Sequence, residues 1–377
     1  MPLKALWGTK IFLYDHCGWS VGLTIGGSGA EQACLDGLCP WEQWTSLPLL
    51  FMLTSGWSCR PCGSVREPDQ RPNYWLFSRL AHAMTSQVLN LLKAMRPQQW
   101  VKNLLVFAGV LFSRNLLDTE KLLVATLASA IFCLLAGGVY VLNDLIDLEN
   151  DRCHPCKCRR PLASGKLRPG VALLGGGLTL GLSLGLAFRV DLAFGGIAGV
   201  YLLQNLAYSR YLKHIVILDV MFIGLGFVLR AVSGAVAVGV EVSTWLILCT
   251  FLLALFLGFS KRRQEILTLG AGGKGHRPIL SEYTPQFLDA MINIVTAATV
   301  ISYALYTMSE RTIEKFHTNH LIFTIPFVIY GIFRYLYLIH RQTLGDNPTK
   351  VLLTDVSIQV NTLLWLIAVV GIIYFGL

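Results

Sequence analysis

Three aspartates stand where a long apolar run meets a basic loop. They are Asp144, Asp147 and Asp151, and Asn143 precedes them. On a continuous helix, these spacings place all the carboxylates on one face. Like charges on one face repel, and carboxylates at a membrane boundary are costly to desolvate, so a cation should compensate them. Hard oxygen ligands suit Mg²⁺, which leaves coordination positions for substrate phosphates. The stretch therefore predicts a Mg²⁺–diphosphate site at a bilayer surface.

A basic segment directly follows these carboxylates. It contains Lys157, Arg159 and Arg160, all within nine residues of Asp151. A run of charged side chains is most often a solvated surface. Here the run follows an acidic cluster that suits a metal-bound diphosphate, and this order favours a clamp for phosphate or diphosphate groups.

A second polar cluster lies near the start of the fifth apolar run. Tyr208 and Lys213 precede it, and Asp219 falls early within it. An acidic residue inside a membrane span indicates a functional site by default. Arg230 follows Asp219 by eleven positions, close to three helical turns, so the two share a helix face without touching. Pairing of Arg230 with a neighbouring helix competes with a role in binding.

Further basic residues mark the ends of other apolar runs. Lys102, near the start of the first run, is either a snorkelling anchor or a phosphate contact. Lys261 and Arg262 end the sixth run. Arg262 can pair with Glu265, or the dense basic cluster can hold anionic head groups. The residues alone leave these alternatives open.

Composition places the chain in a membrane. Of its 377 residues 54% are hydrophobic and only 14% are charged, with a mean hydropathy of +0.56, whereas soluble proteins carry about 25% charged residues. Apolar runs long enough to cross a bilayer predict an all-α, polytopic membrane protein of about nine transmembrane helices. The predicted spans are 100–117, 121–142, 170–188, 192–208, 215–238, 244–260, 287–308, 320–339 and 358–377.

The net charge of +9 follows the pattern of membrane proteins. Basic residues concentrate in one alternating set of loops, including 152–168, 210–213 and 261–277. Loops enriched in Lys and Arg face the cytoplasm. The acidic cluster lies on the same side, so we expect a site that faces the cytoplasm at a bacterial-type cell membrane. Because the basic residues are divided among loops rather than gathered in one domain, no nucleic-acid partner is expected.

The first 83 residues differ from the rest. They are rich in Trp and Cys, and they show no sustained helical or strand period and no convincing span. We expect residues 1–83 to be a poorly structured N-terminal extension and residues 84–377 to form the membrane domain. Our hypothesis is that the start codon is misassigned and that translation begins at Met84. Peptides from residues 1–83 in protein purified from its natural source would exclude it.

Together, the motifs resemble the UbiA-type prenyltransferase superfamily from about Val88 to Leu377. The resemblance rests on the acidic motif, the following Arg160-Pro161-Leu, the span count and the second polar loop. The finer pattern is similar to the decaprenyl-phosphate phosphoribosyltransferases. Its matching pieces are Arg96-Pro-x-Gln-Trp-x-Lys-Asn103, Asp151-Arg-x-His-Pro-x-Lys157-x-x-Arg160-Pro161, Tyr208-Ser-x-x-Leu-Lys213 with Asp219, Gly226-Phe-Val-Leu-Arg230 and Lys261-Arg262-x-x-Glu265.

The resemblance implies a UbiA-like helical bundle and a Mg²⁺-dependent transferase. The implied reaction moves 5-phosphoribosyl from phosphoribosyl diphosphate to a polyprenyl phosphate and releases diphosphate. The site roles that we assign on this basis fall into four groups. Asp144, Asp147 and Asp151 hold Mg²⁺, with Asn143 as helper; Lys157, Arg159 and Arg160 contact diphosphate or the ribose 5-phosphate; Tyr208, Lys213 and Asp219 complete the donor site; Lys102, Arg230, Lys261 and Arg262 are candidates for the lipid phosphate of the acceptor.

One departure from the superfamily pattern bears on the donor. Members that act on aromatic acceptors usually carry a second Asp-x-x-x-Asp, whereas Ile223 stands four residues after Asp219 here. A single carboxylate at this place favours phosphoribosyl diphosphate over a prenyl diphosphate.

Two alternatives stay open. The first is transfer of an isoprenyl group from a prenyl diphosphate to an aromatic or other small acceptor. The second is a transporter or lipid-binding protein with an acidic ion site. The clustering of charged groups at one membrane face, rather than at the midplane, counts against the second alternative.

Overall fold

The structure, a computed structural model, describes residues 74–153, 157–269, 278–341, 351 and 353–376. All of them belong to the unit Pro72–Leu377. Most of the predicted extension 1–83 lies outside the described residues. Helix α1 runs from Tyr74 to Ala94 and therefore crosses the predicted boundary at residue 84. The hypothesis of a misassigned start codon stays a prediction.

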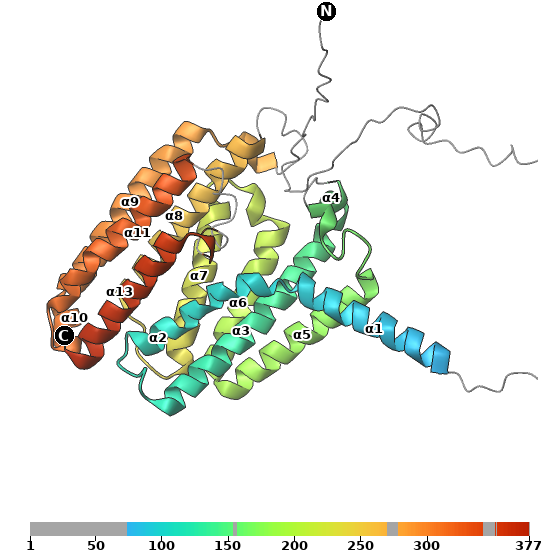
Figure 1. The fold of residues 1–377 in the computed structure, drawn as a ribbon, viewed down its shortest axis with the longest axis horizontal. Helices are drawn as coiled ribbons and strands as arrows, with labels where there is room; N and C mark the ends of the chain where they lie inside the picture. Colours follow the sequence, from blue (N-terminus) through green and yellow to red (C-terminus); the bar gives the residue numbers. More distant parts are fainter. Residues whose placement is uncertain (1–73, 154–156, 270–277, 342–350, 352, 377) are drawn as a thin grey trace, which may run out of the picture. The chain divides into compact units, whose positions relative to one another are not determined.

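All regular secondary structure in the described residues is helical, which confirms the all-α prediction (Figure 1). The elements that follow α1 are η2 (Pro97–Phe107), α2 (Ala108–Leu111), α3 (Thr119–Ile146), α4 (Leu148–Arg152), η3 (Lys157–Arg159), α5 (Pro169–Val190), α6 (Leu192–Arg210), η4 (Leu212–His214), α7 (Leu218–Ala237), α8 (Thr244–Leu269), η6 (Pro278–Ser281), α9 (Pro285–Met308), α10 (Glu310–Phe316), η7 (His320–Thr324), α11 (Ile325–Arg341) and α13 (Val356–Phe375).

Among the described residues, seven helical segments are long and apolar enough to cross a membrane. They are α3, α5, α7, α8, α9, the joined η7 and α11, and α13. Helix α6 occupies the position of the predicted span 192–208, and η2 with α2 occupies part of the first predicted span, so nine is an approximate count.

Large apolar side chains such as Leu174 and Leu178 of α5 are 70% and 73% exposed. Such exposure suits a helix that faces lipid rather than water.

The expectation that 100–117 forms one helical span is wrong. The segment folds as the 3₁₀ helix η2, followed by the four residues of α2. Its backbone lies directly against α7. A Cβ atom on Gly234 would lie 1.9 Å from the carbonyl oxygen of Val106, and one on Gly109 would lie 2.7 Å from the Cα atom of Ala235. This approach requires glycine at both positions, and it holds η2 and α2 against the C-terminal part of α7.

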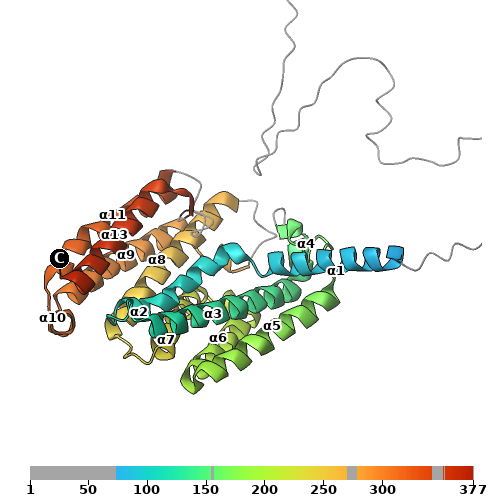
Figure 2. The ribbon, with the colours of Figure 1, turned by 60° about the horizontal axis from the view of Figure 1, so that its bottom comes forward.

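Helix α7 lies between two packed groups of helices. It contacts α6 and η2 on one side and α8 on the other. Figures 1 and 2 show α3, α5 and α6 together, and α8, α9, α11 and α13 together. Each group has its own buried apolar core. One core includes Phe132 of α3 and Phe194 of α6, and the other includes Phe256 of α8 and Ile292 of α9.

The two ends of the bundle differ in the charged residues that they bring together. At one end, α3 finishes close to the loop between α6 and α7, where the predicted polar residues lie. At the other end, α7 and α9 finish, α8 and α11 begin, and the short helix α10 connects α9 to η7. The helices therefore carry polar clusters at both ends.

Candidate functional site

The three aspartates do not lie on one helix. Helix α3 ends at Ile146 and α4 starts at Leu148, and Asp147 forms the break with φ −94° and ψ 11°. The expectation of one continuous helical face is therefore wrong. The break leaves Asp144 and Asp151 buried, at 2% and 3% exposure, whereas Asp147 is partly exposed.

Asp144 and Asp151 share one guanidinium group. Nη1 of Arg160 donates to Oδ1 of Asp144 at 3.1 Å and to Oδ2 of Asp151 at 2.5 Å. Nη2 of Arg96 also donates to Oδ1 of Asp144, and Nζ of Lys157 lies 3.9 Å from Oδ1 of Asp151. Cations thus offset both buried carboxylates, as their burial requires. The structure brings together the predicted acidic and basic groups of this cluster.

Sequence reasoning did not select Arg96 as a site residue. Its backbone is left-handed, with φ 54°, and it directly precedes Pro97 at the start of η2. This conformation costs a non-glycine residue about 1–2 kcal/mol. Its guanidinium carbon lies 4.9 Å from the centre of the Tyr140 ring. The signal that could have found it is a basic residue before a proline, at the head of a motif that also contains Lys102 and Asn103.

The segment that follows α6 is tied to the end of α3. Nζ of Lys213 donates to Oδ1 of Asp147 at 2.8 Å, and the hydroxyl of Ser209 donates to Oδ1 of Asn143 at 2.5 Å. Each contact joins residues 66 positions apart in the chain. Lys213 and Asn143 therefore lie beside the acidic cluster, as expected. Ser209 was quoted only as part of the motif that begins at Tyr208, and it was not selected as a site residue.

Asp219 lies in a second charged cluster, and its ion pair with Arg262 is fully buried. Its Oδ2 accepts from Nε of Arg262 at 2.7 Å, and its Oδ1 accepts from the hydroxyl of Tyr283 at 2.6 Å. Arg262 also donates to Oε2 of Glu265 at 2.6 Å and to the hydroxyl of Tyr208 at 3.3 Å. Asp219 is 0% exposed and Arg262 is 1% exposed. Both carboxylate oxygens of Asp219 are therefore occupied within the protein.

Tyr283, just before α9, was not selected from the sequence. Burial raises the pKa of Tyr283 well above its ordinary value, and its hydrogen bond to Asp219 raises that pKa further. The hydroxyl therefore stays protonated and donates to the carboxylate. Its oxygen also accepts from the backbone N–H of Ile217 at 2.7 Å. Because Ile217 is β-branched and has a φ of 70°, this bond holds a strained turn at the start of α7.

Arg230 is a buried cation without a carboxylate partner among the described residues. It is 6% exposed, and it donates to Oδ1 of Asn103 at 2.8 Å, to the carbonyl of Gly226 at 2.9 Å and to the hydroxyl of Tyr201 at 2.5 Å. All these acceptors are neutral, so no negative charge in the described part of the chain offsets the guanidinium. Lys102 lies close enough for the two cations to repel each other.

The other predicted cations differ in their surroundings. Nζ of Lys261 lies 3.7 Å from Oε1 of Glu265. Arg159 is exposed. Of the residues predicted for the acceptor, Lys261 and Arg262 thus have acidic neighbours, whereas Lys102 and Arg230 form no ion pair within the part of the chain that the structure describes.

Two of the aspartates fit a Mg²⁺ ion. Oδ2 of Asp144 is buried without a hydrogen-bond partner, and a cation would satisfy it. One oxygen each of Asp144 and Asp151 lies near enough to share a single nitrogen of Arg160. Mg²⁺ is commonly bound by one or two carboxylates together with substrate phosphates. Over the described residues no group of three or more His, Cys, Asp or Glu converges, in agreement with the separate pairing of Asp147.

Comparison with known proteins gives concordant matches. A model of the UbiA prenyltransferase family matches residues 103–264. The decaprenyl-phosphate phosphoribosyltransferase of Corynebacterium glutamicum is 35% identical over 290 residues, which are 75% of this chain and 86% of that protein. The protein of the same name from Mycolicibacterium smegmatis is 32% identical over 300 residues, which are 77% of this chain and 94% of that protein.

A solved structure shares the fold. The UbiA homolog from Archaeoglobus fulgidus, in complex with DMAPP and Mg²⁺, matches with a TM-score of 0.59 at 22% identity. The match covers 75% of this chain and 99% of that one. It confirms the expected UbiA-like helical bundle.

The buried pair of Asp219 and Arg262 should be a main support of the bundle. Arg262→Gln leaves the buried charge of Asp219 without a cation, so we expect a loss of about 3–5 kcal/mol in the free energy of unfolding. Asp219→Asn should cost less, because Glu265 still pairs with Arg262. The double variant should lose less than the sum of the single losses. Thermal unfolding in lipid nanodiscs measures these changes.

The matched control for this pair is Arg263→Gln. The neighbouring pair of Arg263 and Asp289 is more exposed on its acidic side, so its loss should cost about 1 kcal/mol or less. An Asp219→Asn protein that keeps wild-type stability would contradict the structural role. Loss of donor binding in such a stable protein would point instead to direct contact between Asp219 and the substrate.

Proposed function

This chain belongs to the UbiA prenyltransferase family, and we propose that it transfers 5-phosphoribosyl from phosphoribosyl diphosphate to a polyprenyl phosphate. Family membership and the curated relatives make it a transferase of the UbiA superfamily, and its apolar helices make it an integral membrane protein. The name carried by relatives that are 32% and 35% identical supports the choice of donor and acceptor.

The observation that carries the proposal is that the buried aspartates have partners of opposite charge, whereas the buried guanidinium of Arg230 has none among the described residues. The aspartates at the end of α3 and in α4 lie among cations, as suits a metal-bound diphosphate. Arg230 and Lys102 have no acidic partner in the described residues. A buried cation without a counter-charge, with a second, partly buried cation nearby, favours an acceptor that is itself an anion. A lipid phosphate meets this condition, whereas a neutral aromatic acceptor does not.

The contacts of Asp219 also favour a phosphoribosyl donor. Both its oxygens bind groups of the protein, and Ile223 stands where a second carboxylate would be needed. A second metal ion would therefore have few available ligands at this place. A donor that relies on the single pair of Asp144 and Asp151 agrees better with this arrangement.

In the proposed reaction a phosphate oxygen of the lipid bonds to C1 of the ribose, and the bond from C1 to the diphosphate oxygen breaks. The bonding electrons leave with the diphosphate, and C1 becomes cationic in the transition state. A lipid phosphate is already a competent nucleophile, so no general base is required. Bound Mg²⁺, held by Asp144 and Asp151, would act as a Lewis acid that stabilises negative charge on the diphosphate.

The basic side chains around the carboxylates have the chemistry to hold the leaving group. Arg96, Arg160 and Lys157 lie against the carboxylates, so they would contact a diphosphate bound there. Arg159 is exposed and could reach the 5-phosphate of the ribose. Because these cations are already in place, they stabilise developing charge without reorganisation.

The remaining donor roles are assigned to residues around this cluster. Asn143 and Lys213 hold the end of α3 and Asp147 in position. Tyr208 contacts Arg262 of the second cluster, and it directly precedes Ser209, which binds Asn143. Asp147 becomes a third metal ligand only if Lys213 moves away. We propose that Asp219 positions Arg262 and Tyr283 rather than contacting the donor itself.

For the acceptor phosphate, the structure favours two of the four predicted cations. Lys102 and Arg230 lie together and lack acidic partners in the described residues. Lys261 and Arg262 lie beside Glu265, and Arg262 also binds Asp219. We therefore assign the lipid phosphate to Lys102 and Arg230, and we assign Lys261 and Arg262 to the support of α8. The concentration of basic residues in the loops at this end supports an active site that faces the cytoplasm.

The donor can be identified directly. Purified protein in nanodiscs, supplied with Mg²⁺, labelled phosphoribosyl diphosphate and a polyprenyl phosphate, should form a labelled lipid and release diphosphate. Thin-layer chromatography and mass spectrometry of the lipid measure the product. Turnover of a prenyl diphosphate with an aromatic acceptor, without any labelled phosphoribosyl lipid, would overturn the proposal in favour of prenyl transfer.

The two buried aspartates should dominate the chemical step. Asp144→Asn and Asp151→Asn should each lower kcat by about a hundredfold or more, the size of loss expected when transition-state charge is no longer stabilised. Steady-state kinetics over a Mg²⁺ titration would measure the effect. The control is Glu149→Gln in the same segment, whose side chain is 82% exposed and pairs with Arg152. Full activity of both aspartate variants would refute the metal assignment.

The acceptor assignment predicts a separate kinetic signature. Lys102→Gln should raise the KM for the polyprenyl phosphate about tenfold, because one charge-assisted contact is lost. The KM for phosphoribosyl diphosphate should change little. Arg230→Lys is a second variant that keeps the charge but loses the forked geometry. The control is Lys166→Gln, at an exposed position near the same end. An effect of Lys102→Gln on the donor KM alone would show that this residue serves the donor.

A further inference from the structure

Helix α1 carries an apolar stripe that no described element covers. Figures 1 and 2 show the N-terminal part of the helix extending away from the other helices. The stripe consists of Met84, Val88, Leu89 and Leu92, whose side chains are 69%, 55%, 53% and 45% exposed. Residues four apart are neighbours on a helix surface, so Met84, Val88 and Leu92 follow one side of α1. An exposed apolar side of this kind marks a surface for lipid or for another protein.

Hydrogen bonds fix the side of α1 that faces the bundle. The side-chain amides of Gln87 and Asn90 donate to the carbonyl oxygen of Lys166 at 3.0 and 3.1 Å. Oε1 of Gln87 also accepts from the backbone N–H of Arg168 at 3.0 Å. Because these bonds hold the polar side of the helix against the segment before α5, the apolar stripe cannot turn toward the bundle.

The contact of α1 with α5 lies near the end of a membrane span. A Cβ atom on Gly175 would lie 2.5 Å from Cδ2 of Leu91, so the glycine lets α1 approach closely. Helix α5 is one of the candidate spans and begins at Pro169, so Gly175 lies about 9 Å along it. A helix in the membrane interface buries its apolar side about 5–10 Å into the boundary between head groups and acyl chains. The contact thus lies at the depth expected of an interfacial helix.

The charge around α1 suits an anionic membrane surface. Residues 84–100 include no Asp or Glu. Ser86 and Lys93, seven positions apart, share a third side of the helix, and both are exposed. Arg168, which bonds to Gln87, is exposed as well. Basic side chains close to a membrane are attracted by its anionic lipids.

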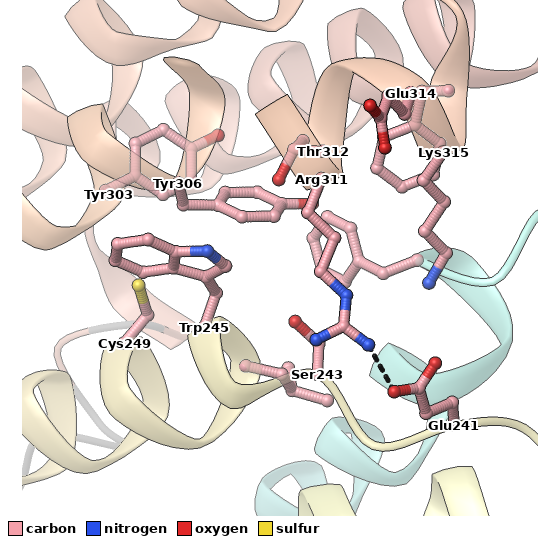
Figure 3. A pocket seen from close by; sticks show the side chains of 13 residues that line it. Glu241, Ser243, Trp245, Cys249, Tyr303, Tyr306, Arg311, Thr312, Glu314 and Lys315 are labelled. Atoms are coloured by element: carbon pink, nitrogen blue, oxygen red, sulfur yellow. Dashed lines mark hydrogen bonds and ion pairs between the residues drawn. The ribbon is translucent and has the colours of Figure 1, made fainter. Parts of the chain in front are cut away.

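Charge is balanced at the pocket on the opposite end of the bundle. This pocket has a volume of about 460 Å³, and its charged lining residues are two acids and two bases, Glu241, Glu314, Arg311 and Lys315. Arg311 pairs with Glu241 (Figure 3). The pocket therefore gives no preference for an anionic ligand. The surface around α1 differs, because basic charge there accompanies an apolar stripe.

We propose that α1 is an interfacial helix that binds the lipid surface at the carboxylate end of the bundle, with Val88, Leu89 and Leu92 among the acyl chains and Lys93 among anionic head groups. A lipid surface, rather than a second copy of the chain, fits best because α1 packs beside Leu174 and Leu178, exposed apolar side chains of a membrane span. The inference requires an integral membrane protein and does not rest on the proposed phosphoribosyl transfer.

The same helix reaches the turn that follows Arg160. The N–H of Leu167 donates to the carbonyl oxygen of Pro161 at 2.8 Å and so closes this turn. The residues on either side of Leu167 are the ones that bond to α1. A lipid-bound α1 therefore restrains the turn beside Arg160, whose guanidinium bonds to both buried aspartates.

Photolabelling identifies what covers the stripe. The full chain is placed in nanodiscs that contain phosphatidylglycerol with a diazirine in its acyl chain, and mass spectrometry of fragmented peptides locates the label after irradiation. Val88 and Leu92 should be labelled to an extent similar to that of Leu174 and Leu178 on α5. Label on α5 without label on residues 84–92 would show that protein rather than lipid covers the stripe, and it would overturn the inference.

Two matched variants test the lipid contact and the restraint of the turn. Val88→Glu places a charge in the stripe and should speed amide hydrogen exchange of residues 84–94 and 162–168 in nanodiscs about tenfold, because burial of one Val side chain is lost. Ser86→Glu adds the same charge to the third side and should leave both rates unchanged. Both positions are exposed, so neither substitution disturbs packing within the bundle. Labelling of Leu174 checks that both variants are inserted in the bilayer.

The exchange rates separate the parts of the inference. Equal rates in Val88→Glu and Ser86→Glu protein would overturn the lipid contact. Faster exchange of residues 84–94 alone would support the contact and refute the restraint of the turn. In nanodiscs of phosphatidylcholine alone, exchange of residues 84–94 should be about fivefold faster than with phosphatidylglycerol, because Lys93 loses its anionic surroundings. Equal rates in the two lipids would refute the role of Lys93.

Discussion

A guanidinium shared by two buried carboxylates organises the carboxylate end of the bundle. Arg160 bonds to Asp144 at the end of α3 and to Asp151 in α4, so it joins the two sides of the break at Asp147. Without cations the two carboxylates would repel each other in a poorly solvated place. The bonds from Arg96 and Lys213 extend the same compensation to η2 and to the segment after α6. The site is thus assembled by charge pairing between elements far apart in the chain.

Helix α7 carries two buried charged residues, and only one of them has a partner of opposite charge among the described residues. Asp219, at its start, is neutralised by Arg262 and bound by Tyr283. Arg230, farther along, meets only neutral oxygen atoms, and one of them belongs to Asn103 of η2. The approach of η2 to within reach of Arg230 depends on Gly234, where a side chain would collide with the backbone of Val106. The close packing of the η2 backbone against α7 therefore places Asn103 beside Arg230, the one buried cation that lacks an acidic partner among the described residues.

The apolar spans were predictable because a bilayer imposes a length and a composition on any helix that crosses it. The break at Asp147 was not. Neither glycine nor proline marks it, and the helical spacing of the aspartates argues for continuity. Asp147 instead takes Lys213 as its partner, a contact between residues 66 positions apart. Arg96 and Ser209 stand in the quoted motifs but were not selected as site residues, and Tyr283 stands in none of them. The contacts that place all three in the site are with residues far away in the chain.

The sequence alone determined that the chain is a helical membrane protein, that its carboxylates and cations gather near one set of loops, and that it resembles UbiA-type transferases. These properties follow from hydropathy, from charge asymmetry and from the order of short motifs, all of which are local. Only the tertiary structure decided which charges neutralise one another. Arg262 and Arg230 are both basic residues in apolar helices, yet one is buried against Asp219 and the other against neutral groups. That difference depends on which helices become neighbours, because Coulomb energy in a low-dielectric interior is decided by a few ångströms of separation.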